Sequence, residues 1–378
     1  MTTSTEDILA RLIAFDTVSA KSNLPLIDYV EDFLTQRGFC VTRIADPDAP
    51  KAGLYAEIGP KAAGVLLSAH SDVVPVEGQV WTRDPFRLTQ DGDRLYGRGT
   101  TDMKGFVAAM LRAADAASHL ALKEPLKLAL SYDEEVGCLG IAQMLERLTP
   151  LIGTPRIAVV GEPTEMQVAI GHKGKRAYRA TIRGEAGHSA MAPQFVNALN
   201  VAADFVKALQ DIQTNLAQTG AQDVAYDVPY STVHVGMLSG GRALNIVPDH
   251  AEMTFEIRHL AQDDPDILEQ QIKDAATRVA MAYGPRAGIE VERLWSYPGL
   301  DTPQGAPVVA EAQRLAGTNS TKVAFGTEAG FFDALGIPTV VCGPGSMSGQ
   351  GHKADEFIFR SQLRACDTLL DRLLHSIC

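Results

Sequence analysis

The stretch LKLALSYDEE, residues 126–135, decides the fold of this chain because an apolar run ends in it directly at acidic side chains. A short apolar run bounded by polar residues is typical of a strand covered on both faces. Two further stretches follow the same rule: VLLSAH at 65–70 ends in a histidine, and IAVVGE at 157–162 ends in a glutamate. Residues 105–117 and 140–148 lie between these strands and have helical apolar spacing. The alternation predicts an α/β fold with a mainly parallel central sheet flanked by helices.

Potential metal ligands stand at the carboxyl ends of these strands. The carboxyl ends of parallel strands meet at one edge of a sheet, so we expect their side chains to lie close together. Carboxylates crowded into a cleft of low dielectric repel each other unless cations neutralise them. The sequence therefore predicts a metal site. The candidate ligands are His70, Asp102, Glu135, Glu162 and His352, with Glu134 as an additional carboxylate.

Each of these residues also has an ordinary structural interpretation. A histidine at a strand end is often only hydrogen-bonded, and Glu134-Glu135 are also typical of a helix start. The joint placement favours the metal site. Asp102, in the glycine-flanked turn GRGTTDMKG at 97–105, is the candidate bridging ligand. Asp72 is placed to accept the second ring N–H of His70 and to fix the orientation of that ring.

The pattern of the chain changes after residue 171. Residues 176–295 show the order strand, helix, strand, strand, helix, strand, which is similar to a split βαβ unit. After Pro298 the earlier alternation returns, with a strand predicted at 323–325. We therefore expect a catalytic domain in two segments, 1–174 and 298–378, and an inserted α+β domain at 175–297.

Composition restricts the function classes. The formal net charge of −12 argues against nucleic acid and against anionic membranes as partners. Five scattered cysteines without a CxxC spacing indicate reduced thiols. The N-terminal residues do not resemble a signal peptide, and no apolar run reaches the length of a membrane span. We expect a cytoplasmic protein that acts on a small molecule.

Several motifs together resemble the zinc aminoacylase and carboxypeptidase G family through nearly the whole chain. These motifs are SAHSDVVP at 68–75, GRGTTDMKG at 97–105, DEEVGCLG at 133–140 and GEPT at 161–164. The resemblance implies two Zn²⁺ ions per chain, for which Co²⁺ or Mn²⁺ could substitute. It implies Glu134 as the general base and Asp72 as the partner of the ligand histidine. It assigns His70, Asp102 and Glu162 to one ion, and His352, Asp102 and Glu135 to the other.

The inserted segment shares this resemblance. Gly187-His188-Ser189 is similar to the family segment whose histidine reaches the substrate carbonyl of the other subunit's site, which implies a homodimer through the inserted domain. Ala190 follows where relatives often carry a second serine. The segments around Asn245 and Arg258 resemble those that bind the substrate carboxylate.

The last third of the chain resembles the family branch that acts on N2-acetyl-L-ornithine, through FGTEAGFF at 325–332 and GHKADE at 351–356. The resemblance implies release of acetate and L-ornithine, a step of arginine biosynthesis. Gly326 and Thr327 would help to hold the carboxylate of this N-acyl amino acid. Glu328 is a candidate partner for the δ-amine, and equally an acidic residue at a helix start. A succinyl-diaminopimelate desuccinylase, another N-acyl-amino-acid hydrolase or dipeptidase, and a non-catalytic ligand-binding relative remain alternatives.

Overall fold

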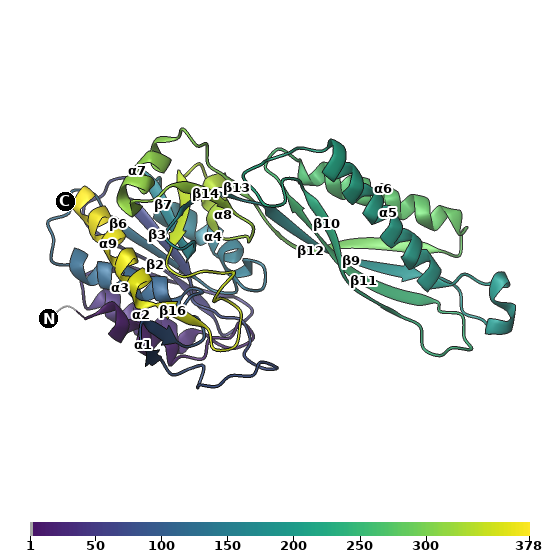
Figure 1. Ribbon diagram of the computed structural model, residues 1–378, viewed down its shortest axis with the longest axis horizontal. Coiled ribbons are helices and arrows are strands. Elements are labelled where there is room, and N and C mark those ends of the chain that lie inside the picture. Colours follow the sequence, from purple (N-terminus) through teal and green to yellow (C-terminus); the bar gives the residue numbers. More distant parts are fainter. Residues whose placement is uncertain (1–2) are drawn as a thin grey trace. The chain divides into compact units, whose positions relative to one another are not determined.

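The computed structural model describes residues 3–378, and its contacts divide the chain into two compact units. The first unit comprises the chain up to Gly171 together with Leu300–Val323 and Thr327–Cys378. The second comprises His172–Gly299 and Ala324–Gly326. Figure 1 shows each unit with its own sheet and its own helices.

The first unit is built on a mixed sheet with the strand order β1-β2-β6-β3-β7-β15-β8-β13, in which β14 pairs with β8. The central strands β6, β3, β7 and β15 run parallel to one another, whereas β1, β2 and β8 add antiparallel pairs. The predicted α/β class is confirmed. The strands are β1 (Cys40–Ala45), β2 (Ala52–Ile58), β3 (Val65–His70), β6 (Leu126–Ser131), β7 (Ile157–Pro163), β8 (Val168–His172), β13 (Leu300–Asp301), β14 (Ser320–Val323) and β15 (Thr339–Gly343).

Helices cover both faces of this sheet. Every residue of β3 and β6 is buried, which explains why their sequences are apolar almost throughout. Alternate residues of β6, such as Leu126 and Leu128, join one large core with side chains of five helices. These helices are α1 (Thr5–Ile13), α2 (Leu24–Thr35), α3 (Lys104–Ala117), α7 (Pro307–Ala316) and α9 (Arg360–Ser376). Two further helices, α4 (Leu139–Ile152) and α8 (Ala329–Ala334), pack on the sheet outside this core.

A small antiparallel sheet in the same unit joins distant parts of the chain. Its order is β16-β5-β4, from Phe357–Phe359, Arg94–Tyr96 and Thr89–Asp91. The pair Phe357↔Tyr96 places the segment after residue 352 beside the turn at 97–102.

The second unit has the element order that the sequence predicts for residues 176–295. Its four-stranded antiparallel sheet has the order β10-β11-β9-β12. Figure 1 shows α5 and α6 lying along the same face of that sheet, where they bury Tyr178 and Phe255. The elements are β9 (Gly174–Arg183), a 3₁₀ helix (Ser189–Gln194), α5 (Ala198–Thr219), β10 (Thr232–Gly240), β11 (His250–His259), α6 (Pro265–Ala282) and β12 (Gly288–Tyr297).

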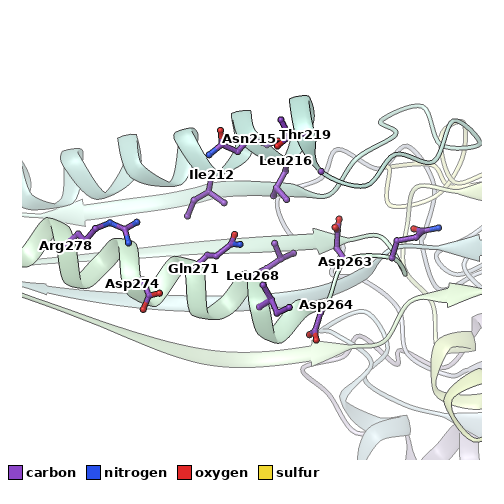
Figure 2. A pocket seen from close by; sticks show the side chains of 13 residues that line it. Ile212, Asn215, Leu216, Thr219, Asp263, Asp264, Leu268, Gln271, Asp274 and Arg278 are labelled. Carbon is purple, nitrogen blue, oxygen red and sulfur yellow. The ribbon is translucent and has the colours of Figure 1, made fainter.

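A hollow of about 590 Å³ lies between α5 and α6, lined by side chains of both helices (Figure 2). Its acidic residues have structural partners. Asp264 caps α6 by accepting the N–H of Asp266 at 2.8 Å, and Asp263 accepts the hydroxyl of Ser231. We assign no ligand to this hollow.

The prediction of a strand at 323–325 is wrong for residues 324 and 325. β14 ends at Val323, and the chain bends after it. The following glycine, Gly326, passes so close to Tyr297 that a Cβ atom would stand 2.0 Å from the Tyr297 hydroxyl. Within residues 3–378, no helix is long and apolar enough to span a membrane.

Candidate metal centre

His70 is the last residue of β3 and its side chain is fully buried. Its Nδ1 lies 3.0 Å from the backbone carbonyl oxygen of Asp72 and 3.4 Å from the Asp72 carboxylate. The sequence points to the carboxylate as the partner, but the carbonyl is closer. When Nδ1 carries the ring proton and donates a hydrogen bond to that carbonyl, Nε2 is the nitrogen that can bind a metal ion.

The carboxylate of Asp72 holds the segment that carries the paired glutamates. Its oxygens accept the backbone N–H of Glu134 at 3.1 Å and of Glu135 at 3.3 Å, and the hydroxyl of Ser19 at 2.7 Å. One buried carboxylate therefore fixes the end of β6 beside the end of β3.

One cluster of candidate ligands forms around His70. Its Nε2 lies 3.1 Å from Oδ1 of Asp102 and 3.7 Å from Oε1 of Glu162, at the end of β7. All three side chains are buried.

The second cluster forms around His352. Its Nε2 lies 3.0 Å from Oδ2 of Asp102 and 2.9 Å from Oε2 of Glu135. Asp102 thus directs one oxygen toward each cluster, which is the arrangement of a bridging carboxylate. The structure brings all five predicted ligands together.

Crowding of these acids shifts their proton affinities. Burial raises the pKa of Glu162 well above its usual range, and the charge of Asp102 raises it further. Burial, followed by the charge of Asp102, raises the pKa of Glu135 to about 7. Burial opposes ionisation of Asp102 as well, but hydrogen bonds with His352 and His70 outweigh it and keep the pKa of Asp102 below its usual value. A divalent cation would relieve this repulsion.

The donor set fits divalent ions. Within residues 3–378, the buried atoms Oε1 of Glu135 and Oε1 of Glu162 have no hydrogen-bond partner. A buried carboxylate oxygen without a partner costs free energy unless a metal ion or another group binds it. Imidazole nitrogens with carboxylate oxygens suit Zn²⁺, Co²⁺ and Mn²⁺.

Glu134 belongs to neither cluster, although it neighbours Glu135. Its Oε1 accepts a hydrogen bond from the thiol of Cys138, with a sulfur–oxygen distance of 3.3 Å. Cys138 has φ 56°, a left-handed conformation that is unusual for a residue other than glycine. This hydrogen bond engages one carboxylate oxygen of Glu134, whose side chain also feels the charges of the candidate ligands Glu135 and Asp102.

The predicted residues of the second unit lie in two places within it. His188 pairs with Ile246 in an isolated β-bridge, and the N–H of Ser189 donates to the carbonyl of Asn245 at 3.1 Å, so His188 and Asn245 stand on adjacent segments. Arg258 lies on β11, where its Nε donates to Glu256 at 2.8 Å.

The three remaining predicted residues follow one another in the chain. Gly326 closely approaches Tyr297, as described above, and the hydroxyl of Thr327 accepts the N–H of Ala329 at 3.0 Å. Glu328 is 1% exposed, precedes α8 and accepts a hydrogen bond from the hydroxyl of Ser131. Its Oε2 has no hydrogen-bond partner within residues 3–378.

Sequence reasoning missed Glu356 and Cys138 as parts of this centre. Glu356 ends the motif GHKADE, four residues after His352, and Cys138 lies within DEEVGCLG, but neither motif indicates what these side chains contact.

Known proteins resemble this chain over most of its length. Residues 66–376 match peptidase family M20/M25/M40. An acetylornithine deacetylase from Shigella sonnei (strain Ss046) is 33% identical, and the match covers 98% of this chain and 97% of that protein. The resemblance inferred from the motifs is confirmed.

Solved structures share the fold. An M20 family metallo-carboxypeptidase from Sulfolobus solfataricus superposes with a TM-score of 0.79 at 20% identity, covering 98% of both chains. A dinuclear metal-binding peptidase of the M20 family from Bacillus subtilis gives a TM-score of 0.69 at 16% identity, covering 99% of this chain and 97% of that one. The family match over residues 66–376 and the full-length relative show that the chain belongs to peptidase family M20/M25/M40, a family of hydrolases.

Proposed function

We propose that the protein is a metal-dependent amidohydrolase that removes the acetyl group of N2-acetyl-L-ornithine, giving L-ornithine and acetate, as in arginine biosynthesis. The observation that carries the proposal is Asp102, whose two oxygens face two separate clusters of ligands. The deacetylase from Shigella sonnei supports the choice of substrate.

The proposed cofactor is a pair of Zn²⁺ ions, for which Co²⁺ or Mn²⁺ could substitute. His70 and Glu162 would hold one ion and His352 and Glu135 the other, with Asp102 shared. When bound, such ions polarise a carbonyl group and lower the pKa of a water molecule toward neutrality.

Glu134 is the proposed general base. Its carboxylate takes a proton from the attacking water while the oxygen adds to the acetyl carbon, and it then gives that proton to the departing α-amine. The C–N bond breaks, and acetate and the amine leave. The thiol of Cys138 holds one oxygen of Glu134, so the other is available for this transfer.

The α-carboxylate of the substrate is proposed to bind Arg258, with Asn245, Gly326 and Thr327 completing its site. Arg258 pairs with the carboxylate of Glu256, and a substrate carboxylate would share or replace that pairing. Glu328 is proposed to supply the negative charge for the δ-amine. Its Oε2, which is buried and has no hydrogen-bond partner among residues 3–378, supports this role.

We further propose that two copies of the chain pair through the second unit, where β10 is an edge strand. Met237 on this strand is 71% exposed and Leu244 beyond it is fully exposed. Apolar groups beside an unpaired strand edge favour association. His188 of the partner subunit would then stabilise the oxyanion of the substrate carbonyl. A cytoplasmic location is part of the proposal.

A substrate panel tests the proposal. The metal-reconstituted protein should show its highest kcat/KM with N2-acetyl-L-ornithine, compared with N-succinyl-LL-diaminopimelate, other N-acyl amino acids and a dipeptide. A preference for one of the other compounds would reassign the substrate within the family. No hydrolysis of any of them after addition of Zn²⁺ or Co²⁺ would favour a ligand-binding protein.

A further inference from the structure

Glu356 places a buried carboxylate inside the turn that presents Asp102, and this residue has no role in the proposed chemistry. Its side chain is 1% exposed. One oxygen accepts the backbone N–H of Thr101 at 2.8 Å and of Asp102 at 3.2 Å. The other accepts the N–H of Gly99 at 3.0 Å and Nη1 of Arg98 at 2.6 Å.

The same residue also fixes its own segment to that turn. The carbonyl oxygen of Glu356 accepts the N–H of Gly97 at 2.9 Å, and the next residue, Phe357, pairs with Tyr96 in the small sheet. His352 lies four residues earlier. The segments that carry Asp102 and His352 are therefore joined through one side chain and its backbone.

A carboxylate is suited to this place for a geometric reason. Three N–H groups of the turn and a guanidinium converge on the site, and only a carboxylate offers two oxygens that accept all four hydrogen bonds. Burying a charge is costly, and the fully buried guanidinium of Arg98 compensates it. The negative charge of Glu356 lies close to the ligand carboxylates and adds to their mutual repulsion. Glu356 therefore does not serve to neutralise the charge of the candidate ligands.

We propose that Glu356 is a positioning residue that holds Asp102 at the correct distance from His352 and thereby sets the affinity of the second cluster for its metal ion. The inference rests on the proposed binding of two ions. His70 and Glu162, by contrast, are held by the buried strands β3 and β7, so the first cluster depends less on Glu356.

The test is Glu356→Gln in the full-length chain. The amide keeps the shape but offers one acceptor oxygen, so the N–H groups of Thr101 and Asp102, or those of Gly99 and Arg98, face an NH₂ group. The metal-free protein is titrated with Zn²⁺ in competition with a chromophoric chelator. We expect one of the two ions to bind about 10- to 100-fold more weakly, the range typical for residues that orient metal ligands, and the other, which also uses Asp102, to lose clearly less affinity.

Asp115→Asn is the matched control for a purely structural effect. Asp115 is also a buried carboxylate, and it accepts Nε of Arg37 at 2.6 Å. It lies in α3, eleven residues after the start of the helix at Lys104, or about 17 Å along the helix axis. This variant should lose thermal stability and bind both ions as tightly as the wild type. Glu356→Asp, which keeps the charge but shortens its reach, serves as the second variant if Glu356→Gln does not fold, and should weaken the same ion.

Two results would overturn the inference. One is wild-type affinity for both ions in the folded Glu356 variants, and the other is an equal loss for both ions that Asp115→Asn reproduces. Failure of the proposed function has a different signature: the wild-type protein would bind both ions and still not hydrolyse N2-acetyl-L-ornithine.

Discussion

Glu134 and Glu135 are neighbours in sequence, yet the structure gives them different surroundings. Glu135 shares its cluster with His352 and Asp102, whereas Glu134 meets the thiol of Cys138. A base that is not itself a ligand can move a proton without disturbing the metal ions. The two residues should therefore respond differently to substitution.

Glu134→Gln should abolish turnover and leave the metal content unchanged. The amide cannot accept the proton of the attacking water, and loss of a general base typically costs about 10²- to 10⁴-fold in kcat. Metal per chain by elemental analysis, together with kcat on N2-acetyl-L-ornithine, checks both parts. His352→Ala is the contrasting variant and should lower the metal content by about one ion per chain. Turnover near that of the wild type in Glu134→Gln would exclude the residue as the base.

Among single residues, the sequence indicates those whose side chains can bind a metal ion and that end an apolar strand. His70 and Glu162 end apolar strands, so their meeting follows from the sheet alone. Glu356 could not be found in the same way, because three of its partners are backbone N–H groups that have no signature in sequence. The closeness of Nδ1 of His70 to a carbonyl rather than to the Asp72 side chain also depends on the local turn.

A buried histidine stands at the end of β8. This strand ends at His172, which is 1% exposed, and the Nδ1 atom of its ring lies 3.0 Å from the carbonyl oxygen of Lys173. Burial lowers the pKa of His172 to about 4, because a charged imidazole cannot be hydrated there. His259 nearby also has a lowered pKa, for which burial is the main cause.

Acid should destabilise the protein through His172. Its pKa is lower in the folded chain than in the unfolded chain, so its full contribution to stability is present above about pH 6.5 and declines as the pH falls toward 4. At pH 5 the loss is about 2 kcal/mol relative to pH 7.5. Urea unfolding of the wild type and of His172→Asn at both pH values measures it. The variant should lose less stability between the two pH values, and an identical loss would show that His172 does not titrate in this way.

Strands with a continuous apolar run that ends at a polar residue are predictable from sequence, whereas strands without that signal are not. β3, β6 and β7 have continuous apolar runs, and their predicted bounds agree with the structure within a few residues at each end. β1 and the short strands β4 and β5 are partly exposed, so their sequences lack a clear period. The antiparallel pairs that make the main sheet mixed join β1 to β2, β2 to β6 and β8 to β15. They are not predictable, because the direction of a strand leaves no mark in its sequence, and β2 and β8 are not bounded by the signals that mark β3, β6 and β7.

The residues with predicted functions are distributed over both units of the molecule. All five candidate ligands and Glu134 belong to the first unit, whereas His188, Asn245 and Arg258 belong to the second. If two copies pair as proposed, a working site takes ligands from one chain and His188 of the partner subunit.

Mixing two inactive variants tests this sharing of residues. His188→Ala and Glu134→Gln should each be inactive alone, but a hybrid dimer contains one complete site. Random pairing makes half of the dimers hybrids, so the mixture should recover about a quarter of wild-type activity. Mass spectrometry of the intact dimers shows whether subunits have exchanged. Proven exchange without recovered activity would contradict a contribution of His188 across subunits.

The shared carboxylate of Asp102 has a consequence for how the protein acquires its metal ions. Because each ion would use one oxygen of the same group, the two loading steps are thermodynamically linked, and each ion must alter the affinity for the other by the same factor. The first ion would orient the carboxylate and would also withdraw part of its charge. If the loss of charge outweighs the orientation, the second ion binds more weakly than the first, and singly loaded protein accumulates when metal is limiting.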